Sequence, residues 1–157
     1  MQRAEVEAHY VARGHDRFGE DRGLGITSLH YKVAAHDTGG GLFIIEQTIW
    51  KKGGPPRHIH HDQEEWFYPI EGDFVVEVGG RGISLAPGDS LLAPRKLPHT
   101  WAYVGDNTGR ILIAFSPAGK MEAFFREVTK AGAMPPETPE LWRAHGMELV
   151  GPPLEVS

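Results

Sequence analysis

The 157-residue chain contains no cysteine. This absence excludes a disulfide, a thiolate nucleophile and a thiolate metal site. No segment approaches the roughly 20 consecutive apolar residues of a membrane-spanning helix, so we expect no membrane partner. Residues 1–23 lack the apolar core of a signal peptide. We therefore expect a cytoplasmic protein.

Basic residues are also in the minority. There are 16 Lys and Arg against 21 Asp and Glu, which gives a net charge of −5 with His neutral. This balance argues against a nucleic-acid partner, because phosphate binding requires a basic face. Glycine and proline are abundant instead, at 20 and 12 residues. Helix bundles rarely tolerate so many, and the composition favours a turn-rich, mostly β protein.

Short β-rich segments separated by Gly, Pro and Asp turns fill the middle of the chain. Their spacing of about eight to twelve residues is typical of a β-sandwich or barrel. The predicted strands are 26–35, 42–50, 57–60, 65–70, 74–78, 82–86, 90–94, 99–104 and 110–116. The apolar run at 42–50 predicts burial on both faces of that strand.

The last part of the sequence has a different pattern. Within residues 120–132, apolar side chains recur at helical spacing, at Met121, Phe124, Phe125 and Val128. A second short helix is indicated over residues 137–146, with Pro139 at its first position. We expect one domain, 1–157, made of an N-terminal arm (1–25), a barrel (26–116) and a C-terminal helical segment (117–157).

Three of the nine histidines lie within four positions in the stretch PPRHIHHDQEEWFYPIEG, residues 55–72. In a strand, residues i and i+2 share a face, so His58 and His60 point the same way. A carboxylate would return across the following turn on the next strand. Glu64 and Glu65 both satisfy that requirement, and strand periodicity alone leaves the choice open.

Neutral imidazoles with a carboxylate form a ligand set for one divalent Fe, Mn, Ni, Zn or Cu ion. His99, after the turn PRKLP, is a candidate further ligand from a distant part of the chain. Three imidazoles and one carboxylate leave a divalent site with a charge of about +1, and an octahedral ion would keep two open positions. The alternative is that HIHH, residues 58–61, is a solvated surface loop without a metal. The glutamate that follows at a suitable distance, the Gly turn and the later His99 argue against this alternative.

These residues resemble the two motifs of the cupin superfamily. The first motif corresponds to Gly53, His58, His60, Glu65 and Gly72, and the second to Gly82, Pro87, Gly88, Asp89 and His99. The gap between Gly82 and Pro87 is one residue shorter than usual. The resemblance implies that Glu65, and not Glu64, completes a metal set with His58, His60 and His99.

The resemblance also implies a fold and an activity. The fold is all-β, a double-stranded β-helix or jelly-roll barrel, here with one or two short C-terminal helices. The chain is most similar to small single-domain bacterial cupins of the quercetin 2,3-dioxygenase-like group. That likeness implies a metal-dependent dioxygenase acting on an aromatic or enolic small molecule, with Glu65 both binding the metal and taking the hydroxyl proton.

Apolar residues are candidates for the substrate pocket. Trp101 and Tyr103 share a face with His99 by strand parity. The remaining candidates are Phe43, Ile45, Phe67 and Phe115. Plain barrel core is the competing interpretation for each of these side chains.

Two other functions use the same ligand set. In one, the ion acts as a Lewis acid for isomerisation, cyclisation or decarboxylation, with Tyr103, Glu46 or His61 as the base. In the other, the protein binds a small molecule without catalysis.

A homodimer is expected as well. If Glu65 faces the histidines, Trp66, Tyr68 and Ile70 form an apolar patch on the outer face of the same strand, which a second copy would cover.

Overall fold

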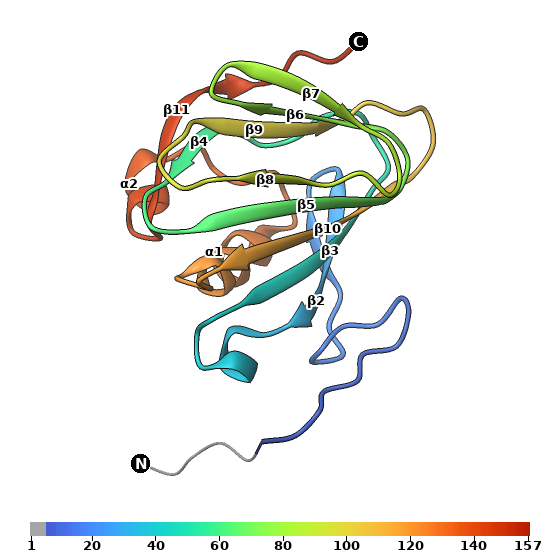
Figure 1. Cartoon of the computed structure of the whole chain (residues 1–157), viewed down its shortest axis with the longest axis vertical. Coiled ribbons are helices and arrows are strands. Elements are labelled where there is room, and N and C mark those ends of the chain that lie inside the picture. Colours follow the sequence, from blue (N-terminus) through green and yellow to red (C-terminus); the bar gives the residue numbers. More distant parts are fainter. Residues whose placement is uncertain (1–5) are drawn as a thin grey trace.

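A computed structural model describes residues 6–157. Its strands form two antiparallel sheets that enclose the core, which confirms the predicted all-β barrel (Figure 1). The first sheet has the order β1 (Arg22–Leu24), β2 (Thr27–Val33), β3 (Phe43–Ile49), β10 (Gly109–Ser116), β5 (Glu64–Glu71) and β8 (Leu91–Ala93). The second has the order β11 (Met147–Pro153), β4 (Pro56–His60), β9 (His99–Tyr103), β6 (Phe74–Val78) and β7 (Arg81–Leu85).

Strand β3 crosses the middle of the larger sheet, between β2 and β10. Phe43, Ile45 and Ile49 are fully buried on its inner face. The prediction that both faces are buried is wrong for Ile44 and Thr48, which are partly exposed. The outer face of this sheet is therefore open to solvent at these positions, as is common in antiparallel sheets.

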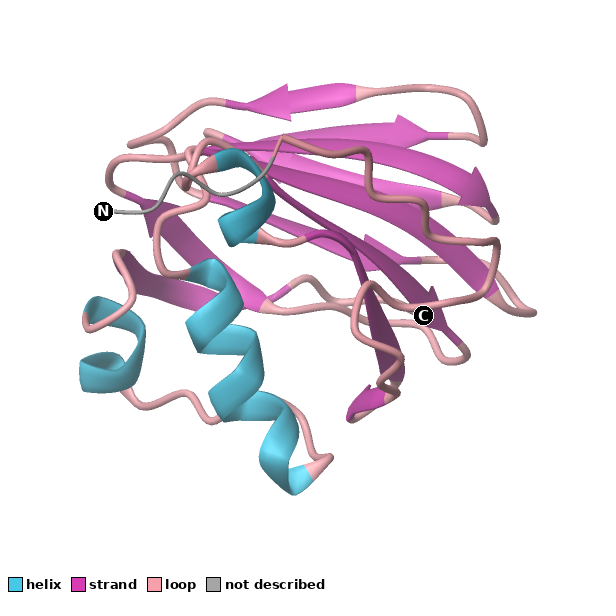
Figure 2. Ribbon diagram, turned by 90° about the horizontal axis from the view of Figure 1, so that it is seen from below, coloured by secondary structure: helices cyan, strands magenta, loops and turns pink. Residues whose placement is uncertain are grey.

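Two α-helices lie side by side at one end of the barrel (Figure 2). They are α1 (Met121–Val128) and α2 (Pro139–Arg143), and two short 3₁₀ helices are η1 (Ala35–Thr38) and η2 (Thr129–Ala131). All four apolar residues predicted to share one face of α1 are buried. The ring of Phe124 meets that of Trp142 of α2 edge to face, with centroids 5.0 Å apart. No helix within residues 6–157 has the length and apolarity needed to cross a membrane.

The sequence analysis missed the edge strand β11, which lies inside the segment expected to be helical. The other edge strand of interest, β1, lies inside the expected arm, where one strand was considered possible. Strand β11 ends with Pro152 and Pro153. Proline has no N–H to donate to a neighbouring strand, so it is tolerated in an edge strand such as β11 but not in a central one. It pairs with β4, where Leu149 lies opposite His58, and so it supports the strand that carries two predicted ligands.

Candidate metal centre

The four predicted metal ligands come together between the two sheets. His58 and His60 lie on β4, and His99 lies directly opposite His58 on β9 of the same sheet. Glu65 reaches the cluster from β5 of the other sheet. One candidate ligand atom from each residue lies within 4.8 Å of the others, and all four residues are buried.

The close contacts of the cluster centre on Glu65. Its Oε1 lies 2.8 Å from Nε2 of His60 and 3.2 Å from Nε2 of His99. The contact with His99 has hydrogen-bond geometry, whereas Nε2 of His60 has no hydrogen-bond partner among the described residues. The carboxylate therefore joins the histidine sheet to the opposite sheet.

The protonation states suit a cation. Burial, followed by the charges of His99 and His60, lowers the pKa of His58 to about 3, so its ring is neutral at pH 7. Its Nδ1 donates to the carbonyl of Pro56 at 2.7 Å, which leaves Nε2 with its lone pair free. Burial raises the pKa of Glu65, but the close contacts with the rings of His60 and His99 outweigh it, and the net pKa is lowered.

Unpaired buried atoms also fit a metal ion. Nε2 of His60 and Nδ1 of His99 are both fully buried, and neither has a hydrogen-bond partner within residues 6–157. Buried polar atoms without a partner are costly. Neutral imidazoles around one carboxylate form a set that divalent transition metals accept, and such an ion would satisfy Nε2 of His60, which is otherwise unpaired.

The neighbouring Glu64 lies outside the cluster. It forms a bidentate ion pair with Arg95, with Nη2 of Arg95 2.6 Å from Oε1 and its backbone N–H donating to Oε2 at 2.7 Å. The hydrogen bonds from Arg95 lower the pKa of Glu64. The register of β5 thus turns Glu65 inward and Glu64 toward the turn before His99.

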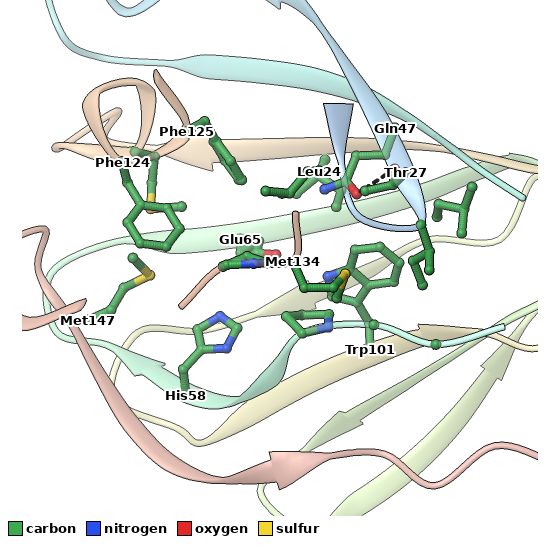
Figure 3. Close-up of a pocket in the computed structure, with 18 of the residues that line it drawn as sticks. Leu24, Thr27, Gln47, His58, Glu65, Trp101, Phe124, Phe125, Met134 and Met147 are labelled. Atoms are coloured by element: carbon green, nitrogen blue, oxygen red, sulfur yellow. Dashed lines mark hydrogen bonds between the residues drawn. The ribbon is translucent and has the colours of Figure 1, made fainter. Parts of the chain in front are cut away.

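A mostly apolar cavity of about 70 Å³ opens from His58 and Glu65. Helix α1 contributes Phe124 and Phe125 to its wall (Figure 3). Met121 of α1 and Trp142 of α2 line it as well. Gly54 lies in the segment before β4, where an added Cβ would come within 1.9 Å of the Trp101 carbonyl oxygen. A residue with a side chain does not fit this close approach of two backbones, which shapes the cavity wall beside Trp101.

Only some of the predicted pocket residues line this cavity. Trp101 and Phe115 do, whereas Phe43, Ile45, Phe67 and Tyr103 are buried in the barrel core without lining it. Tyr103 packs against Phe74 and donates its hydroxyl to the carbonyl of Asn107 at 2.7 Å. Strand parity identifies the inner face correctly, but it does not say how far along the barrel the cavity extends.

Sequence reasoning missed several lining residues. The helical spacing at Met121, Phe124 and Phe125 indicated a buried face, but not that the face closes the site. Thr27 and Gln47 carried no motif, and neither did Met134 in the loop before α2. For these residues the sequence holds no local signal, because their role depends on packing between distant segments.

Comparison with known proteins agrees with this geometry. The family model described as "Cupin domain" matches residues 45–115, which contain all four clustered residues. A cupin from Shewanella frigidimarina, described as RmlC-like, superposes with a TM-score of 0.56 at 20% identity, covering 74% of this chain and 96% of that one. This chain belongs to the cupin superfamily. The superposition supports the shared fold.

Two of the curated relatives are dioxygenases. Quercetin 2,3-dioxygenase of Bacillus subtilis is 33% identical over 107 residues, which cover 68% of this chain and 31% of the relative. Human 3-hydroxyanthranilate 3,4-dioxygenase is 36% identical over 55 residues, covering 35% of this chain and 19% of the relative. The chain thus spans a third or less of the length of these two relatives.

Proposed function

We propose that this cupin is a metal-dependent dioxygenase that acts on an aromatic or enolic small molecule. The observation that carries the proposal is the position of His58 and Glu65 in the lining of a cavity whose other walls are mostly apolar and aromatic. Such walls receive a flat, largely apolar substrate and exclude water from the reacting atoms. The two dioxygenase relatives support the same reaction class.

The residues have distinct roles in this proposal. His58, His60, His99 and Glu65 hold one divalent Fe, Mn, Ni, Zn or Cu ion. When bound, the ion supplies a positive centre that favours the deprotonated form of a substrate hydroxyl and brings dioxygen next to it. Glu65 accepts the hydroxyl proton, because no other carboxylate lines the described cavity. Trp101 and Phe115 are placed to flank the rings of the substrate.

The Lewis-acid alternative requires a separate base beside the substrate. Tyr103 is held by Asn107 away from the cavity. Glu46 is paired with Arg110 at 2.6 Å, and His61 is exposed. The described cavity therefore offers none of the three predicted bases, and this favours the oxygenase over that alternative. A binding protein without catalysis is the other alternative and requires no base at all.

Substrate entry requires movement of the cavity wall. A volume of about 70 Å³ is smaller than the roughly 300–1,000 Å³ of typical ligand pockets. Met134 lines the cavity, is 42% exposed, and belongs to a segment without regular structure. Its unbranched side chain has several rotatable bonds, so it is the wall residue best suited to move aside for a planar ring system.

Oxygen uptake tests the proposal. The protein is loaded separately with Fe, Mn or Ni, and a flavonol is added without oxygen. A shift in the flavonol absorption spectrum is expected, followed by oxygen consumption in proportion to substrate lost once air is admitted. Glu65→Gln should slow turnover by about 10²–10⁴ beyond its loss of metal, and Glu64→Gln is the matched control. Turnover of an enol or phenol without oxygen would favour the Lewis-acid alternative instead.

A further inference from the structure

Two polar side chains line the cavity among its apolar walls. Thr27 of β2 and Gln47 of β3 are each only 5% exposed. Figure 3 shows them together, across the cavity from His58 and Glu65. Their neighbours in the wall include Leu24, Ile26 and Ile49. A polar pair in such surroundings requires either hydrogen-bond partners in the protein or a partner in the cavity.

Hydrogen bonds within the protein satisfy only some of the donors and acceptors of these two side chains. The Thr27 hydroxyl donates to the carbonyl of Thr48 at 2.9 Å, and its oxygen lies 3.2 Å from the Gln47 side-chain oxygen. A primary amide has two N–H donors and an oxygen that accepts two hydrogen bonds. The contact with Thr27 is the one side-chain contact of Gln47 with hydrogen-bond geometry within residues 6–157, and the single Thr27 proton makes it a hydrogen bond only when it turns away from Thr48. The rest of this buried amide faces the cavity.

The strand register gives the distance from this pair to the metal centre. Glu65 lies opposite Phe115 on β10, and Phe115 lies opposite Phe43 on β3. Gln47 is four residues beyond Phe43, which corresponds to about 13 Å along the strand at the usual rise per residue. Strand side chains stand roughly perpendicular to the sheet, so this separation also applies to the side chains. A single six-membered ring is too short to touch both ends.

We propose that Gln47 and Thr27 form a distal subsite that binds a hydroxyl group of the substrate. The substrate is then a molecule of two or more joined rings, with its metal-binding enol at one end and a hydroxyl at the other. A hydroxyl both donates and accepts, so it pairs with either end of the Gln47 amide. This inference rests on the proposed function and adds to it the length and polarity of the substrate.

The subsite is tested by binding without oxygen, so that no turnover occurs. The probes are flavonol with no further hydroxyl, and two flavonols that each add one hydroxyl, on the phenyl ring or on the far side of the fused ring. Dissociation constants for the metal-loaded protein come from the absorption shift. One added hydroxyl should tighten binding about tenfold, as expected for one well-placed hydrogen bond in a buried site.

Substitutions then assign that gain to the pair. Gln47→Met keeps the length and approximate volume of the side chain, and it should abolish the gain, so that plain and hydroxylated flavonols bind this variant with similar dissociation constants. Thr27→Val should reduce the gain, and it is a second route if Gln47→Met does not fold. Thr48→Val is the matched control, because Thr48 follows Gln47 on β3 but its side chain lies on the outer face of the sheet. This variant should keep the full gain.

The outcomes separate the two proposals. If plain flavonol binds but neither added hydroxyl tightens binding, or the gain survives in Gln47→Met, the distal subsite is wrong and the metal site stands. If no flavonol shifts the spectrum of any metal form, the proposed function fails and the subsite falls with it. A gain that depends on Gln47 supports both.

Discussion

His58 and His99 lie directly opposite each other on strands β4 and β9, with ring centroids 4.6 Å apart, although 41 positions separate them in the sequence. The pairing fixes both backbones through the sheet rather than through loops. Side chains that start from paired strand positions have little freedom to separate. The candidate metal centre is therefore built into the barrel before any ion binds.

Removal of either paired histidine should sharply reduce metal binding without unfolding the barrel. His58→Ala or His99→Ala leaves three candidate ligands, and an N/O site that loses an imidazole binds divalent metals much more weakly. Bound metal is measured by elemental analysis after dialysis, and folding by circular dichroism. His61→Ala, an exposed neighbour, is the control. A full equivalent of tightly bound ion in either variant would contradict the assignment.

The two adjacent glutamates should behave differently. Glu65→Gln removes the buried carboxylate that contacts His60 and His99, and we expect metal affinity to fall by at least tenfold. Glu64→Gln removes only an ion pair with Arg95, whose side chain is 40% exposed, so metal affinity should stay within about twofold. Titration with a metal indicator measures both. The reverse ranking would mean that the strand register is wrong by one residue.

A homodimer is expected through the outer face of β5. Trp66 and Tyr68 stack there with centroids 5.4 Å apart, Leu92 of β8 lies opposite Trp66, and Ile70 is 36% exposed. An apolar patch of this kind is typical of an interaction surface. Trp66→Glu should convert the dimer to a monomer in light scattering, whereas Trp50→Glu, outside the patch, should not. A monomeric wild type at micromolar concentration would disprove the dimer.

Stability should depend strongly on Asp16, which anchors the N-terminal arm. Its carboxylate accepts the backbone N–H of Phe18 at 2.8 Å and of Tyr31 at 2.6 Å, and it pairs with the buried guanidinium of Arg22. Asp16→Ala leaves that guanidinium with the half-exposed Glu20 as its one carboxylate partner within residues 6–157. We expect the free energy of unfolding to fall by about 3 kcal/mol in urea denaturation.

The exposed Asp21, which contacts His30, provides the control, and Asp21→Asn should change stability by less than about 0.5 kcal/mol.

The pH dependence of stability gives a second check on the role of Asp16. Burial raises the pKa of Asp16, but the hydrogen bonds from Arg22 and from backbone N–H groups lower it by a larger amount. The net pKa therefore lies below 3.8. The stabilisation is therefore present above that pH and lost as the pH falls through the folded-state pKa. An equally acid-sensitive Asp16→Ala protein would contradict this role.

The sequence by itself determined the local features of this protein. Alternation with period two placed His58 and His60 on one face, Gly and Pro turns marked most of the strands, and helical spacing identified the buried face of α1. These features depend on neighbours within a few residues, and they can be read without knowing the fold. The turn PRKLP before His99 made that residue a candidate further ligand, and the resemblance to cupins supplied the choice of Glu65.

Only the tertiary structure decided what surrounds the cluster. The register of β5 turned Glu65 inward and left Glu64 on the other face, where it forms an ion pair with Arg95. The packing of α1 and α2 closed the cavity with Phe124 and Trp142, and the pairing of β2 with β3 brought Thr27 next to Gln47. Strand periodicity fixes the face of a residue but not its depth in the barrel or its partner from another segment. Those depend on contacts between residues far apart in the sequence, which no local pattern encodes.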